Sequence, residues 1–190
     1  MNINEADYKT FSTRLQEINR IVAAELLPLK ENQLNWKPAT SSWSVAECIE
    51  HLLLAFQGYL TGLDNVITKA KAENNHAVKP FQLTLMGKLM VFAVNPSSKV
   101  PIPSPPKFKP KKRKVFNHEV LHKFNNTIQR LHSQLEASRN FDWNKYKITS
   151  PVSPLIHLSV GDTYEVLTLH SLRHLKQAQR VMAQPHFPAE

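Results

Sequence analysis

Four stretches of the chain repeat apolar residues at the spacing of an amphipathic helix, which restricts the fold to one built from long helices. They cover about residues 5–27, 44–71, 117–138 and 159–182. In each stretch the apolar side chains recur every three or four residues and so share one helical face. Only four glycines, against thirteen prolines in 190 residues, favour helices joined by stiff connections over a turn-rich β fold. We therefore predict a single all-α domain over residues 1–190, folded as a four-helix bundle.

Two of these helices carry residues that mark where they begin. Ser44 followed by Glu47 forms the S-x-x-E pattern of a capping box, which predicts that the second helix begins at Ser44. Ser159 and Asp162 form a similar pair at the start of the last helix. An acidic side chain in the first turn also favours the positive end of the helix dipole.

A long proline-rich connection, residues 72–115, separates the second and third helices, and we expect a short helix near 83–94 but no pair of strands anywhere. Seven cations and no acid fall within 99–114, so the net charge of +9 leaves 9 − 7 = +2 for the rest of the chain. Because the basicity is local, it favours a solvated basic loop over a nucleic-acid-binding surface. The basic loop, residues 107–114, includes Lys111, Lys112, Arg113 and Lys114.

The apolar stretches also bear on the compartment. None is long enough to span a bilayer, and the opening residues MNINEADYKT do not resemble a secretory signal. Cys48 is the only cysteine, which excludes an internal disulfide and agrees with a reducing cytosol. We expect a cytoplasmic protein without a membrane span.

Two pairs of histidines are spaced four residues apart, and helical periodicity separates their environments. His118 and His122 share their face of the third helix with polar residues, so this face is expected to meet solvent. His170 and His174 lie on the apolar side of the last helix. A buried imidazole without a partner costs on the order of 1–3 kcal/mol. Each of the latter two rings therefore needs a hydrogen bond, a metal or a wet cavity.

His51 supplies a third imidazole, at the edge of the apolar face of the second helix. Its stripe continues as Ala55, Gly58 and Gly62, small residues that leave either a close helix contact or a cavity beside the ring. Three neutral imidazoles suit one divalent transition metal such as Zn, Ni, Co or Fe. Without a fourth protein ligand, such a metal keeps positions open for water or substrate. The alternative is three histidines satisfied by hydrogen bonds where two helices meet.

Two segments of the chain also carry a family resemblance. The segment 34–52, LNWKPATSSWSVAECIEHL, starts a helix with tryptophan and serine, followed by glutamate and histidine. The segment 169–181, LHSLRHLKQAQRV, contains H-x-x-x-H followed by glutamine. Together they resemble the two signatures of the DinB-like superfamily of four-helix-bundle metalloenzymes. The residues that carry the resemblance are Trp43, Ser44, Glu47, His51, His170, His174 and Gln177.

This resemblance implies that His51, His170 and His174 bind one divalent metal, and that the protein is a metal-dependent enzyme acting on a small molecule. Characterised branches of the superfamily include S-transferases and isomerases that use low-molecular-weight thiols. The metal would then hold such a thiol co-substrate as thiolate or, in a hydrolase, lower the pKa of bound water. No residue separates a hydrolase from a thiol transferase. Dimers are common among relatives, which leaves a homodimer open.

Three further residues have two interpretations each. Glu47 could act as a general base, but its place in the capping box explains it equally well. Gln177 could accept a hydrogen bond from an imidazole N–H, or simply pack. Trp43, like Trp36, is expected to anchor the core rather than to contact substrate. For the chain as a whole, the alternative is a non-enzymatic module whose basic loop contacts nucleic acid or another polyanion.

Overall fold

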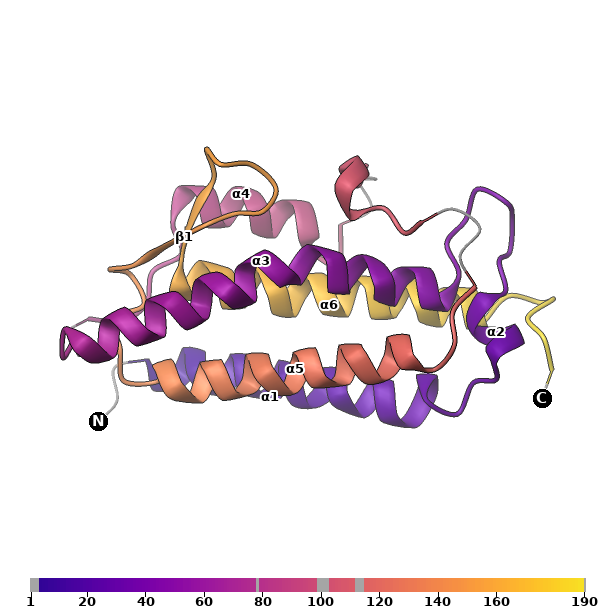
Figure 1. The fold of residues 1–190 in the computed structure, drawn as a ribbon, viewed down its shortest axis with the longest axis horizontal. Helices are drawn as coiled ribbons and strands as arrows, with labels where there is room; N and C mark the ends of the chain where they lie inside the picture. The colour runs from indigo at the N-terminus through magenta and orange to yellow at the C-terminus, as the bar shows by residue number, and fades with distance from the viewer. Residues whose placement is uncertain (1–3, 78, 99–102, 112–114, 190) are drawn as a thin grey trace.

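Four long helices dominate the computed structural model, which describes residues 4–77, 79–98, 103–111 and 115–189. These helices lie side by side, with α3 and α6 in one layer and α1 and α5 in the other (Figure 1). Most of the described residues are helical, as the all-α prediction requires. The bounds of the four are α1 (Glu5–Ile21), α3 (Val45–Ala72), α5 (Glu119–Ser138) and α6 (Val160–Met182).

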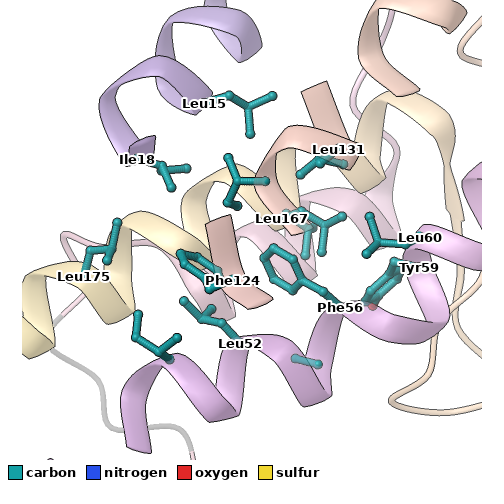
Figure 2. Close-up of a cluster of buried hydrophobic side chains, with 14 of the residues drawn as sticks. Leu15, Ile18, Leu52, Phe56, Tyr59, Leu60, Phe124, Leu131, Leu167 and Leu175 are labelled. Atoms are coloured by element: carbon teal, nitrogen blue, oxygen red, sulfur yellow. The ribbon is translucent and has the colours of Figure 1, made fainter. Parts of the chain in front are cut away.

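The apolar faces of the four helices meet in one core (Figure 2). These are the side chains that the helical periodicity placed inward, and full burial of each contributes roughly 1.5–3 kcal/mol. α1 ends in a π-helical turn, η1 (Val22–Leu26), and a short helix, α2 (Glu31–Asn35), leads towards α3. The core side chains that are almost fully buried include Leu15, Ile18, Leu52, Phe56, Phe124, Leu131, Leu167 and Leu175.

Both predicted capping boxes are present. The Ser44 hydroxyl accepts a hydrogen bond from the Glu47 backbone N–H at 3.2 Å, and Glu47 Oε2 accepts one from the Ser44 N–H at 2.9 Å. The Ser159 hydroxyl and the Asp162 carboxylate make the reciprocal pair at 3.1 and 2.9 Å. α3 and α6 therefore begin where the sequence predicted. The start of each helix, together with the helical period, determines the direction in which its histidines point.

The short helix predicted near 83–94 is α4 (Leu85–Val94), and Asp162 ties it to α6. The Asp162 carboxylate accepts hydrogen bonds from the Thr84 backbone N–H at 2.9 Å and from the Thr84 hydroxyl at 2.7 Å. Thr84 is the N-cap of α4. One buried carboxylate thus stabilises the positive ends of two helices and holds α4 beside α6.

A β-hairpin precedes α6, and the expectation that the chain has no strand pair was wrong. β1 (Lys147–Thr149) pairs antiparallel with β2 (His157–Ser159). The hairpin packs on α3 at its glycines, since a Cβ on Gly62 would lie 2.5 Å from Ile148 Cγ2. A Cβ on Gly58 would lie 3.0 Å from Pro151 Cβ. The small residues of α3 therefore serve a close contact, although with a hairpin and not with another helix.

The rest of the connection before α5 contains a 3₁₀ turn, η2 (Pro106–Phe108). Lys111 of the predicted basic loop is exposed. Lys112, Arg113 and Lys114 lie outside the described residues. Among the helices that are described, none combines the length and the hydropathy needed to cross a membrane.

Candidate metal centre

Three imidazoles from two neighbouring helices meet at one point. His51 comes from α3, and His170 and His174 come from α6, one turn apart. Their potential ligand atoms all lie within 4.8 Å of one another, and the Nε2 atoms of His51 and His170 are 3.1 Å apart. Within the described part of the chain, this is the group of histidine, cysteine or acidic residues that could hold a metal ion.

The second histidine pair has a different environment. His118 precedes α5 and its Nε2–H donates a hydrogen bond to the Leu29 carbonyl at 2.6 Å. His122 is exposed on the surface of α5, as its polar neighbours predicted. The i, i+4 spacing alone therefore does not distinguish a possible metal site, whereas the apolar side of the helix does.

Hydrogen bonds select the tautomers of two of the clustered rings. His51 Nδ1 lies 2.8 Å from the Phe108 carbonyl oxygen, which can only accept, so Nδ1 carries the proton. His174 Nδ1 lies 3.0 Å from Gln177 Oε1 and donates to it in the same way. In both neutral rings Nε2 is left with a lone pair, the form in which imidazole binds metal.

Burial keeps these rings neutral. Desolvation lowers the pKa of His51 below its usual value, and the hydrogen bond to Phe108 opposes this only in part. Desolvation, reinforced by the neighbouring imidazoles, holds the pKa of His170 well below its usual range. For His174, desolvation and the charge of His51 lower the pKa to about 3. At neutral pH no proton therefore competes with a cation for these nitrogens.

Trp43 covers one side of the cluster. Its ring stacks on His174 with centroids 5.8 Å apart, and its centroid lies 5.0 Å from that of His51. The tryptophan is half-buried against the core, as expected for an anchor, but it also lines the cavity described next. Trp36 instead packs edge-on against Phe187.

A cavity of about 1230 Å³ adjoins the three imidazoles. α3 and α6 form one wall, and α4 with the proline-rich segment around η2 forms the other. His170 and His174 therefore line this cavity at the edge of the apolar core, on the side of α6 that the helical wheel indicated. The cavity is also lined by the side chains of Arg173, Arg180 and Lys109.

Glu47, one turn before His51, has both carboxylate oxygens engaged at the start of α3. Oε2 accepts from the Ser44 N–H, and Oε1 accepts from Lys37 Nζ at 2.8 Å. Glu47 is not among the residues that line the cavity. These contacts favour its capping role over that of a general base.

A family model described as the DinB superfamily matches residues 14–178. The chain belongs to the DinB superfamily. The match covers the three clustered histidines as well as Trp43 and Gln177. No curated protein and no solved structure matches the chain. Membership of the DinB superfamily and the three-histidine group, of which His51 and His174 are buried, are together compatible with a metal-dependent enzyme.

Several residues at the site of this DinB protein were missed by reasoning from sequence. The Phe108 carbonyl that orients His51 belongs to the backbone and follows no residue pattern. The sequence offers no sign of Arg173 and Arg180 either, because they lie opposite the apolar arc of the last helix, where a solvent-exposed face is expected. That side of α6 is instead partly covered by α4 and the segment after it, and Arg173 donates to the Asn95 carbonyl at 2.8 Å.

Proposed function

We propose that this DinB protein is a metal-dependent enzyme of the cytoplasm, with the four-helix-bundle fold of its superfamily. His51, His170 and His174 would bind one divalent transition metal, Zn, Ni, Co or Fe, and a small-molecule substrate would occupy the adjoining cavity. The observation that carries the proposal is the pair of Nε2 lone pairs, on His51 and His174, that the Nδ1 hydrogen bonds of these rings direct towards His170.

The donor set fits such a metal better than it fits three structural histidines. A structural imidazole satisfies its nitrogens separately, as His118 does with the Leu29 carbonyl. In the cluster, His51 Nε2 accepts a hydrogen bond from His170 Nε2–H at 3.1 Å, so these two rings bond to each other and not to a carbonyl or hydroxyl. A cation replaces that contact with two favourable ones, because imidazole is a common ligand of Zn, Ni, Co and Fe.

The residues around the histidines would prepare the site for chemistry. The Phe108 carbonyl and Gln177 hold two rings in the metal-binding tautomer, so no rotation is needed on binding. Trp43 excludes water from one side of these rings, while the cavity gives access from the other. A divalent metal with open positions lowers the pKa of a water or thiol that reaches it, which supplies the nucleophile of a hydrolase or of a thiol transferase.

Metal analysis of purified variants tests the proposal. We expect about one equivalent of metal in the wild type and in His122→Ala, which removes an exposed histidine of α5. His170→Ala should lose the metal while its far-UV circular dichroism stays that of a folded helical protein. A wild type that takes up no metal under replete conditions overturns the proposal. It would favour the polyanion-binding alternative, which a salt-sensitive interaction through Lys111, Lys112, Arg113 and Lys114 would then support.

A further inference from the structure

The cavity beside the histidines contains positive charge without compensating acids. Arg173, Arg180 and Lys109 line it, and none of its described lining residues is an aspartate or a glutamate. Histidine side chains carry no negative charge, so the three imidazoles do not offset these cations. A metal site with carboxylate ligands offsets part of the charge of the ion, but this one would leave a divalent cation uncompensated. The charge balance therefore favours an anionic occupant.

The positively charged side chains come from both walls of the cavity. Along α6, Gln177 and Arg180 follow His174 at three-residue steps, so Arg180 stands about 9 Å further along the helix axis. Arg180 and His174 line the same cavity, so a molecule inside it can reach both side chains. Lys109 lies on the opposite wall, directly after Phe108, whose carbonyl orients His51.

The two arginines have different tasks. Arg173 Nη1 donates to the carbonyls of Asn95 and Ser98, at 2.8 and 3.4 Å, and so attaches the end of α4 to α6. Arg180 lines the cavity with an exposed side chain, as does Lys109. Arginine presents a planar fork of donors that matches carboxylate or phosphate oxygens. Arg180 is thus the residue best suited to contact a ligand that enters from solvent.

We propose that the small molecule bound in this cavity carries a carboxylate or phosphate group, and that Arg180, with Lys109 facing it, binds this group. The other end of the molecule then reaches the three histidines. The inference rests on the proposed function, because the reactive end is placed at the metal. It adds the substrate class, which is an anionic molecule with its charge and its reactive group at opposite ends.

Two thiols that differ mainly in charge test this inference on protein loaded with Co²⁺. Mercaptopropionate carries a carboxylate, and mercaptoethanol carries a hydroxyl instead. Thiolate binding to Co²⁺ gives a charge-transfer absorption that reports affinity without any turnover. We expect the wild type to bind mercaptopropionate on the order of tenfold to a hundredfold more tightly, as one charge-assisted contact allows. Arg180→Gln should lose this preference, and Lys109→Gln should reduce it.

Lys176→Gln is the matched control, because it removes one positive charge from the same helix at an exposed position that does not line the cavity. It should keep the preference of the wild type. Equal affinities for the two thiols in the wild type, or an unchanged preference in Arg180→Gln, overturn the inference and leave the metal site intact.

Failure of the metal site is distinguished by a second measurement on chelator-treated protein. Inorganic phosphate should raise the melting temperature of the wild type and of Lys176→Gln more than that of Arg180→Gln. If Co²⁺ does not bind but this difference is present, the proposed enzyme function fails while the anion site stands. If phosphate acts equally on the three proteins, the anion site is rejected.

Discussion

Acidification of the metal-free protein should reveal how strongly the fold holds His174 in its neutral form. The side chain is 8% exposed, and its pKa is lowered to about 3 from the ordinary value of 6.5. Below the ordinary value the unfolded chain binds a proton that the folded chain excludes, so stability falls as the pH falls from there towards the folded pKa. Above the ordinary value His174 is neutral in both the folded and the unfolded state, so its contribution to stability no longer changes with pH.

The size of the effect follows from the gap between the two values. A pH of about 5 is about 1.5 units below the pKa of the histidine in the unfolded chain, and each unit corresponds to about 1.4 kcal/mol of unfolding free energy. His174 alone therefore destabilises the metal-free protein by about 2 kcal/mol relative to its state near neutral pH. His170 adds to this loss of stability, because its pKa is also held well below the usual range.

Denaturant unfolding of chelator-treated protein, followed by circular dichroism, measures this loss near neutral pH and near pH 5. Between the two conditions, the free energy of unfolding should fall less in His174→Leu than in the wild type, by about 2 kcal/mol. His122→Leu, which removes an exposed histidine, should keep the wild-type loss. If His174→Leu and the wild type lost the same free energy, burial would not be what keeps this imidazole neutral, and the electrostatic account of the cluster would be wrong.

Three other outcomes are expected. Gln177→Leu removes the acceptor of His174 Nδ1–H and should weaken metal binding by roughly 10-fold to 100-fold in competition with a chromophoric chelator, whereas unchanged affinity would contradict the orienting role. Gly62→Ala should lower the free energy of unfolding by about 1–3 kcal/mol, because its Cβ would meet Ile148 Cγ2 at 2.5 Å, and the loss should shrink when Ile148→Ala is introduced first. Burial raises the pKa of the Cys48 thiol far above its usual range, so a disulfide reagent should label it only after denaturation; rapid labelling of the native protein would refute this.

The parts of the fold that could be predicted are those whose signal is local in the chain. The four long helices follow from apolar residues that recur every three or four positions, and this pattern extends over several turns. The starts of α3 and α6 follow from pairs such as Ser44 and Glu47, because a capping box is complete within four residues. The placement of His170 and His174 on one face follows from the same period.

The missed features depend on contacts between distant segments. β1 and β2 have three residues each, which is too short for an alternating pattern to be recognised. Gly58 and Gly62 were recognised as a stripe of small residues, but only the structure shows that a hairpin about 90 positions later lies against them. Arg180 could not be placed at a cavity from the sequence, because a helical wheel contains no information about α4 and the connection, which form a cavity over that side of α6.

The two walls of the cavity differ in how much of the apolar core depends on them. The wall formed by α3 and α6 is also part of the apolar core, so changes there disturb packing throughout the molecule. The opposite wall includes residues of an irregular segment, such as Pro103, Ser104 and Pro105, none of which is buried. Substitutions at these three positions can therefore change which molecules the cavity accepts while the three imidazoles stay in place. Such changes have to stop before Phe108, whose carbonyl orients His51, so selectivity and reactive centre are separated by only a few residues of the chain.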